Sequence, residues 1–158
     1  MIPITLKGII DEDFVNYKVP SMTLMFPKCS FKCGETICQN SGLLDADNIT
    51  IDVDTLCKRY INNLISEAIV CQGLEPFDSF TELVALISRL RIQYDVMDDF
   101  VIYTGYEKPE IEDKITKLSA YKNIVVKFGR YIQDDNPHKD DILGVILASS
   151  NQYAERIS

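Results

Sequence analysis

The chain has 158 residues, a length typical of one domain, and its 46% hydrophobic and 25% charged residues are those of an ordinary globular protein. Its net charge of −8 argues against a nucleic acid or an anionic membrane as a partner, since both are negatively charged. No apolar run approaches the length of a membrane span, and the apolar start, residues 1–10, is too short for a signal peptide. We therefore expect one cytoplasmic domain over residues 1–158.

The first elements are expected to be strands. Residues 1–18 hold two short apolar pieces and an acidic turn, which favour a small hairpin or an edge strand. Residues 19–26 predict a stronger strand, bounded by Pro20 and Pro27. This strand leads directly into a loop that holds three of the five cysteines.

The loop cysteines, Cys29, Cys33 and Cys38, are close enough in sequence to bind one metal centre. A structural zinc or a closed iron–sulfur cluster needs four protein ligands, so three thiolates leave one metal position open for chemistry. An odd number of cysteines also excludes a complete set of intrachain disulfides. The alternatives are a zinc site completed by another ligand, and thiols that are merely buried.

The next part of the chain predicts a helix. Residues 41–52 are polar and turn-like, and apolar residues at helical spacing then predict a helix over residues 53–65. Asp52 is expected to be its N-cap. Cys57 falls on the apolar face, so it is interpreted as a small buried side chain.

Strands and helices alternate through the middle of the chain. Strands are expected at residues 68–71, 100–104 and 124–128. Ser79 and Glu82 have capping-box spacing at the start of a second helix, and Pro109 suits the first turn of a third. This alternation predicts an α/β fold with a parallel sheet and right-handed crossovers.

The end of the chain predicts less regular structure. Residues 133–141 are expected to be a charged loop, residues 142–147 a last strand, and residues 148–158 a polar tail. His138, the only histidine, lies in that loop and is interpreted as a solvated surface residue. No linker divides the chain into two domains.

The residues that follow the predicted strands point to a binding site. In parallel sheets ligands collect at the carboxyl ends of the strands, where we expect the loops after four strands to converge. These loops hold the three cysteines, residues 72–76, residues 104–106 and residues 129–131. Glycine in such loops lets backbone approach a ligand, although each loop is alternatively only a turn. Cys71 ends one of the strands and is interpreted as core.

These motifs resemble a known family. Cys29-x3-Cys33-x4-Cys38 followed by Gln39-Asn40 resembles the cluster loop of radical S-adenosylmethionine enzymes, and Gly73-Leu74-Glu75-Pro76 resembles their Gly-Gly-Glu-Pro motif. A narrower resemblance is to the activating proteins of anaerobic, glycyl-radical ribonucleoside-triphosphate reductases. It rests also on the turns at residues 103–106 and 129–132 and on the ending at residues 149–152, and it covers residues 20–152.

The sequence departs from the family pattern at three positions. The usual Cys-x3-Cys-x2-Cys spacing would place the third cysteine at Thr36 instead of Cys38. The residue before that cysteine is commonly aromatic and is here Ile37, and Leu74 replaces the second glycine of the Gly-Gly-Glu-Pro motif. In its expanded cysteine loop the chain resembles a divergent branch of these activators.

The resemblance implies a fold, cofactors and a partner. The fold would be an open partial (β/α) barrel of mostly parallel strands, of the radical S-adenosylmethionine type. Cys29, Cys33 and Cys38 would hold three irons of a [4Fe-4S] cluster, and S-adenosylmethionine would chelate the fourth. The reduced cluster would cleave it to methionine and a 5′-deoxyadenosyl radical, which takes a hydrogen atom from a glycine of the partner reductase. An electron donor such as flavodoxin would reduce the cluster.

The resemblance also implies contacts to S-adenosylmethionine. Gly73 and Leu74 would present backbone to its methionine amino group, with Glu75 nearby. Ile37 and Gln39 would flank the adenine, and Thr104 is a further candidate contact.

Two rival functions remain open. A radical enzyme that modifies another protein or peptide would share the cluster and differ in the partner. A non-catalytic module would hold zinc with the three cysteines and one further ligand.

Overall fold

The most apolar runs of the sequence form the centre of one mixed sheet. The computed structural model describes residues 1–30 and 45–158. Over these residues the main sheet has the strand order β10-β7-β6-β5-β3-β2. Its strands are β2 (Gly8–Asp13), β3 (Ser21–Phe26), β5 (Ala68–Gly73), β6 (Asp99–Tyr103), β7 (Ile124–Phe128) and β10 (Tyr153–Arg156). The four central strands, β3, β5, β6 and β7, are parallel, and both edge strands are antiparallel to their neighbours.

Two small antiparallel pairs flank this sheet. They are β1 (Pro3–Leu6) with β4 (Ile49–Asp52), and β8 (His138–Asp140) with β9 (Val145–Leu147). The described strands form an open sheet, so the open partial barrel inferred from the family resemblance stays a prediction. Within the described ranges, no helix combines the length and the apolar character that crossing a membrane requires.

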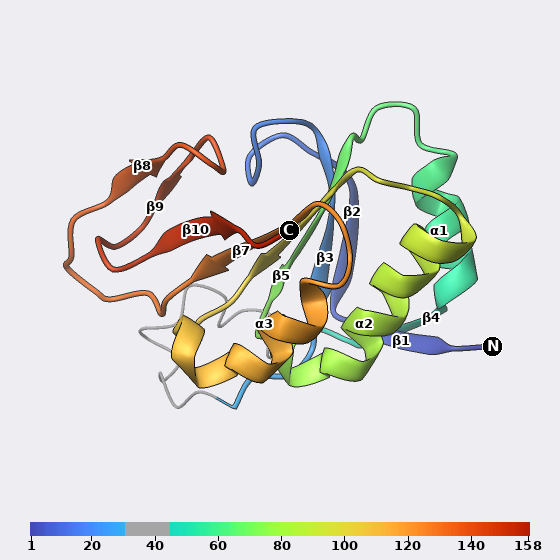
Figure 1. Cartoon of the computed structure of the whole chain (residues 1–158), viewed down its shortest axis with the longest axis horizontal. Helices are drawn as coiled ribbons and strands as arrows, with labels where there is room; N and C mark the ends of the chain where they lie inside the picture. The colour runs from blue at the N-terminus through green and yellow to red at the C-terminus, as the bar shows by residue number, and fades with distance from the viewer. Residues whose placement is uncertain (31–44) are drawn as a thin grey trace.

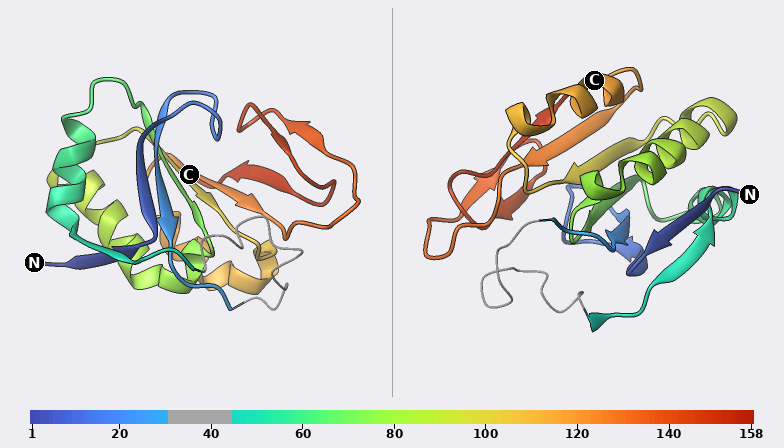
Figure 2. Two further views of the ribbon diagram at one scale, coloured as in Figure 1. Left: turned by 180° about the vertical axis from the view of Figure 1, so that it is seen from behind. Right: turned by 90° about the horizontal axis from the view of Figure 1, so that it is seen from below.

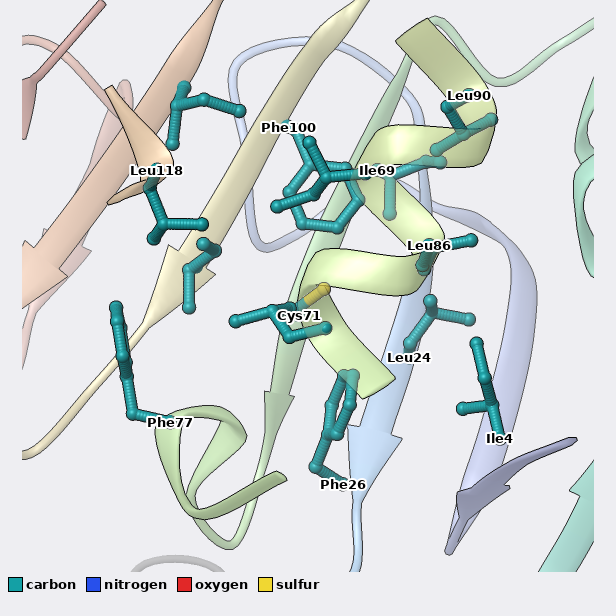
Figure 3. Packing of buried hydrophobic residues seen from close by; sticks show 14 of the residues in the cluster. Ile4, Leu24, Phe26, Ile69, Cys71, Phe77, Leu86, Leu90, Phe100 and Leu118 are labelled. Atoms are coloured by element: carbon teal, nitrogen blue, oxygen red, sulfur yellow. The ribbon is translucent and has the colours of Figure 1, made fainter. Parts of the chain in front are cut away.

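Among the described residues, three α-helices cover one face of the sheet. Figures 1 and 2 show this helical layer. The helices are α1 (Val53–Ile61), α2 (Phe80–Ser88) and α3 (Glu112–Leu118); the 3-10 turns Pro76–Ser79 and Lys108–Ile111 precede α2 and α3, and the π-turn Arg89–Gln93 extends α2. Alternate strand residues such as Ile69, Cys71 and Phe100 pack against Leu86 and Leu90 of this helical layer (Figure 3). The main core lies between sheet and helices.

The helix ends follow local hydrogen bonding. Asp52 caps α1, because its carboxylate accepts hydrogen bonds from the backbone N–H groups of Asp54 and Thr55, as predicted. The helix ends at Ile61, before the predicted residue 65. The Asn63 amide oxygen accepts from the Ile65 and Ser66 N–H groups and fixes a turn there.

The predicted capping box at the start of α2 is wrong. Ser79 makes no capping hydrogen bond, and the Glu82 carboxylate instead accepts from the Thr5 N–H at 3.0 Å. Glu82 therefore joins β1 to α2, a long-range contact that spacing alone does not reveal. Pro109 lies in the first turn before α3, as expected, and there Glu110 accepts from the Glu107 N–H at 2.8 Å.

In the described part of the chain, the second face of the sheet is covered without helices. A smaller core joins Val70, Val101 and Val125 to residues of two covering segments: Tyr17 from residues 14–18, which we call the strap, and Leu143 and Leu147 of the β8–β9 hairpin. The strap is anchored at several points. Buried Asp13 accepts from the Val15 N–H at 2.8 Å and from the Thr23 hydroxyl at 2.5 Å. The Tyr103 hydroxyl donates to the Asn16 carbonyl at 2.6 Å.

Several polar segments form strands that were not predicted. β4 lies in the stretch expected to be turn-like, β8 in the expected charged loop, and β10 in the expected polar tail. In β10 only Ala154 is buried, so the segment lacks the apolar alternation that marks a strand. The expected strand at residues 142–147 is present over its last part as β9, which pairs with β8. The predicted strands at 19–26, 68–71, 100–104 and 124–128 are confirmed as β3, β5, β6 and β7.

Candidate functional site

The carboxyl ends of the four parallel strands meet at a cavity of about 840 Å³. Its lining includes Cys29 after β3, Gly73 at the end of β5, Thr104 after β6, and Gly129 and Arg130 after β7. The strap and the β8–β9 hairpin supply the remaining wall. The structure thus brings together the described strand ends that the sequence placed on one rim.

Gly73 is required where β5 ends. Its φ is +97°, and a Cβ atom there would lie 2.3 Å from the backbone nitrogen of Phe26. The next residue, Leu74, donates its N–H to the Phe26 carbonyl at 3.0 Å. Glycine therefore lets the loops after β3 and β5 run together into the cavity wall, which both Gly73 and Leu74 line.

Glu75 is fully buried and joins the ends of β5 and β6. Its carboxylate accepts from the Gly105 N–H at 2.8 Å, the Thr104 hydroxyl at 2.9 Å and the Phe77 N–H at 3.0 Å. Burial raises its pKa to about 7, and these three bonds oppose that rise. Glu75 is not among the described residues that line the cavity, so its contact with a ligand stays a prediction.

Thr104 lines the cavity, but its hydroxyl is used internally. It donates to Glu75 and accepts from the Tyr106 N–H at 3.0 Å. The Tyr106 hydroxyl donates to Asp78 at 2.7 Å and lies 2.9 Å from the Ser30 hydroxyl, while the Ser30 N–H donates to Asp78 at 2.7 Å. The residue after Cys29 is thereby held against the loops that follow β5 and β6.

The predicted metal ligands are only partly described. Cys29 is half-buried and lines the cavity, whereas Cys33, Ile37, Cys38 and Gln39 lie outside the described residues. Among the residues that are described, no group of three or more His, Cys, Asp and Glu side chains is arranged to hold a metal ion. The cluster loop therefore stays a prediction apart from the position of its first cysteine.

The other candidate ligands belong to the interior or to the hairpin. Cys57 and Cys71 are fully buried in the main core, as predicted, and burial raises the pKa of the Cys57 thiol to about 12. Metals bind the thiolate, so this environment opposes metal binding. His138 is half-buried in β8, not solvated as expected, and no partner for its Nδ1 is found among the described residues.

A layer of polar side chains lies on the cavity face of the sheet, and sequence reasoning missed its lysine. This polar layer consists of Gln72, Tyr103 and Lys127, which line the cavity from β5, β6 and β7. Tyr103 and Lys127 are register partners, and Gln72 follows the paired residues Cys71 and Ile102. The sequence contains a sign of this layer, because Lys127 is a charged residue inside an otherwise apolar five-residue strand.

Lys127 is the most unusual member of the polar layer. It is only 6% exposed, its ammonium group donates to the Gly129 carbonyl at 2.9 Å, and it lies 5.7 Å from the centre of the Tyr103 ring. Burial lowers its pKa to about 8. A lysine held in this way is expected to serve a purpose beyond packing.

The cavity is cationic although the protein is acidic. Its described lining includes Lys18, Lys127 and Arg130 and no aspartate or glutamate, in a chain with a net charge of −8. The cationic lining favours an anionic group on whatever binds there.

The segment after β9 fixes the loop that follows β7. Gln152 accepts from the Ala148 and Ser149 N–H groups at 3.1 Å and donates to the Gly129 carbonyl at 3.3 Å. Asn151 donates to the Arg130 carbonyl at 2.9 Å. The Ser-Asn-Gln ending therefore has a structural role, because its amides hold the cavity wall at Gly129 and Arg130.

Comparison with known proteins identifies the family. The chain is similar to a chloroplastic chaperonin GroEL of Trieres chinensis, with 36% identity over 87 residues. That match covers 55% of this chain and only 15% of the relative's length, so it says little about activity. A family model described as a 4Fe-4S single cluster domain matches residues 20–154, from the start of β3 into β10. The chain therefore belongs to the family of 4Fe-4S single cluster domains and is an iron–sulfur protein.

Proposed function

We propose that this protein is an iron–sulfur activase that reductively cleaves S-adenosylmethionine and generates a glycyl radical on an anaerobic ribonucleotide reductase. Its family supports the cluster. The observation that carries the rest is the shared cavity, because Cys29 borders the same space as Gly73, Leu74 and Thr104. A cluster held at Cys29 would have a ligand in this cavity as its neighbour.

The described residues fit this pair of cofactors. The cavity volume of about 840 Å³ lies in the range of small-molecule sites. Cys29, Cys33 and Cys38 would hold the cluster, and Gly73 and Leu74 would lie along S-adenosylmethionine, with Ile37 and Gln39 at its adenine. When bound, the cluster supplies the electron that breaks a carbon–sulfur bond of the sulfonium.

The protein's own contribution to this chemistry is positioning. Glu75 fixes Thr104 and Gly105 through direct hydrogen bonds and so holds two strand ends in one geometry. Gly73, which lines the cavity, allows the backbone at the end of β5 to lie against that of Phe26. The apolar core beneath the strap and the hairpin lies on the same face of the sheet as the cavity and borders it.

The mouth of the cavity supports a macromolecular substrate. Phe14, Val15 and Ile146 line the cavity and yet are 69%, 76% and 73% exposed. The strap that carries Phe14 and Val15 is anchored by the hydrogen bonds of Asp13. These bonds fix the backbone from which the two exposed side chains extend. Exposed apolar groups around a cavity are typical of protein contact surfaces. They support a glycine-bearing segment of a partner protein as the substrate.

Anaerobic reconstitution with iron and sulfide tests the cluster and the reaction. We expect about four irons per chain and cleavage of S-adenosylmethionine on reduction. The Cys29→Ala variant should lose both, whereas Cys57→Ala, which alters a core thiol, should keep both. Stoichiometric zinc without cleavage would instead identify the metal-binding module. Cys38→Ala tests the spacing, because survival of the cluster would show that Cys38 is not the third ligand.

The partner is tested separately. Co-expression with an anaerobic reductase should produce a glycyl radical signal in electron paramagnetic resonance. Phe14→Asp with Val15→Asp should reduce that signal by a much larger factor than it reduces cleavage of S-adenosylmethionine. Ile92→Asp on an exposed site of the π-turn should change neither. Cleavage without any radical on the reductase would favour the alternative, a radical enzyme that acts on another protein or peptide.

A further inference from the structure

The residue after Cys29 is held by two side chains, those of Asp78 and Tyr106. The Asp78 carboxylate accepts from the Ser30 N–H at 2.7 Å and from the Tyr106 hydroxyl at 2.7 Å. The Tyr106 hydroxyl also lies 2.9 Å from the Ser30 hydroxyl, so the loops after β3, β5 and β6 close a ring of contacts. Neither Asp78 nor Tyr106 is among the described residues that line the cavity. Their contact with the cysteine loop is therefore separate from the space that a ligand would occupy.

The Asp78 carboxylate is fixed from two sides. Asp78 belongs to the 3-10 turn Pro76–Ser79, where its N–H donates to the Glu75 carbonyl at 3.1 Å. Tyr106 is fixed by the loop after β7, because its carbonyl accepts from the Gly129 N–H at 3.1 Å. The carboxylate therefore has a defined position relative to the residue that follows the first predicted cluster ligand.

The charge of Asp78 is not neutralised by a neighbouring cation. Among the described residues Asp78 forms no ion pair, and both of its oxygens accept from neutral donors. Burial raises the pKa of Glu75 and of Tyr106, and the Asp78 carboxylate raises both further. This half-buried negative charge, which solvent screens only in part, lies one hydrogen bond from the backbone of Ser30.

We propose that Asp78 is a redox-tuning residue, whose fixed carboxylate makes a cluster held at Cys29 harder to reduce. A negative charge beside a cluster opposes the addition of an electron, and net charge is one of the factors that set cluster potentials. The inference rests on Cys29 as a cluster ligand, which is part of the proposed function, and needs neither S-adenosylmethionine nor the reductase. A cluster that is hard to reduce is a strong reductant once reduced, as cleavage of a sulfonium would require.

A purely structural role for Asp78 makes a different prediction. In that case only its hydrogen bonds would matter, and Asp78→Asn would have little effect. The asparagine amide oxygen accepts from the Ser30 N–H, and its NH2 group donates to the Tyr106 hydroxyl oxygen, whose proton still serves the Ser30 hydroxyl. Asp78→Asn therefore removes the charge and retains the ring of contacts.

Potentiometric titration of the reconstituted protein without S-adenosylmethionine measures the effect. Titanium(III) citrate supplies the single electron that reduces the cluster, and electron paramagnetic resonance reports the reduced form. Asp78→Asn should move the midpoint to a less negative potential, by at least about threefold in the reduction equilibrium, or about 28 mV for one electron. The control is Asp95→Asn, the same change at an exposed aspartate before β6, at the opposite end of the sheet. A shift no larger than that of the control would overturn the proposal.

Two further variants separate charge from geometry. Asp78→Glu keeps the charge and should bring the midpoint closer to that of the wild type than Asp78→Asn does. Ser30→Ala removes the hydroxyl contact to Tyr106 but keeps the charge, so it should shift the midpoint much less than Asp78→Asn. Equal shifts in Ser30→Ala and Asp78→Asn would show that loop geometry sets the potential, and would overturn the proposal.

Failure of the proposed function is visible independently, because the midpoint is measured on the cluster alone. A protein that does not cleave S-adenosylmethionine but shows the expected shift in Asp78→Asn would refute the function and leave the inference standing. A protein that cleaves S-adenosylmethionine and keeps its midpoint in Asp78→Asn would refute the inference alone.

Discussion

Two layers of side chains on one face of the central sheet have opposite roles, although they lie two residues apart on the same strands. Val70, Val101 and Val125, the apolar layer, lie beneath the strap and the hairpin and form a core. Gln72, Tyr103 and Lys127, the polar layer, line the cavity. The strands are continuous through both layers, so their covering segments decide which layer stabilises the fold and which meets a ligand. The polar residues lie where the apolar covering of this face ends.

Placing a charge in the apolar layer should have the largest effect. Val125→Lys places an ammonium group in the apolar layer, where Tyr17 and Leu143 close off the solvent. We expect a loss of more than about 4 kcal/mol in the free energy of unfolding, because that charge has neither a partner nor a cavity. Urea denaturation followed by circular dichroism measures it. A loss below about 1 kcal/mol would show that the two layers do not differ in this way.

Gly73→Ala should be the next most damaging change, since Gly73 ends β5 directly beyond the polar layer. A positive φ and a clash with the backbone of Phe26 should together cost about 3 kcal/mol. Gly8→Ala is the matched control, because its added Cβ would meet only the flexible end of the Met25 side chain. Thermal unfolding of the two variants should therefore differ clearly, and equal midpoints would contradict the assigned strain.

Glu75 should make stability depend on pH in a defined window. Its pKa is raised in the folded protein from 4.5 to about 7, so its contribution is fully present below pH 4.5 and is lost as the pH rises to 7. The wild-type stability should fall by about 2 kcal/mol relative to Glu75→Gln across that window. Urea titrations at several pH values measure this difference. A constant difference between the two proteins would show that Glu75 is not held in its protonated form.

Lys127→Met should have the smallest effect, in the opposite direction. Replacing a buried unpaired charge by an apolar group of similar length should raise the free energy of unfolding at pH 7 by about 1 kcal/mol. The gain should shrink as the pH rises from about 8 toward 10.5, because the wild-type lysine then loses its charge more easily when folded than when unfolded. Denaturation without ligand at pH 7 and pH 10 tests both statements.

The parallel core of the fold could be predicted from the sequence because its strands are short apolar runs. Residues 124–128 match β7 at both ends, and Asp52 caps α1 as its position implied. The edges could not be predicted in the same way. β10 buries only Ala154, and it is defined by pairing with β7 rather than by its own composition. The Glu82 carboxylate likewise accepts a hydrogen bond from the Thr5 N–H, 77 residues away in the chain.

The candidate site also has residues that could be predicted from the sequence and residues that could not. Gly73 and Thr104 could be placed at the cavity because ligands collect where parallel strands end. The role of Glu75 was not visible, since its hydrogen-bond partners lie in the next strand–loop unit. Lys127 of the polar layer was missed because residues 124–128 were interpreted only as an apolar strand, and the face of the sheet on which the lysine lies was not considered.

The two donors that share the Gly129 carbonyl give Lys127 freedom to move. If the ammonium group turned toward a ligand, the Gln152 amide would still donate to that carbonyl, and Gly129 would keep a partner throughout. The change would break no other described contact of the loop, because Asn151 holds the Arg130 carbonyl separately. Ligand entry should therefore need the rotation of one side chain and no refolding of backbone, so association is expected to be fast and free of a slow conformational step.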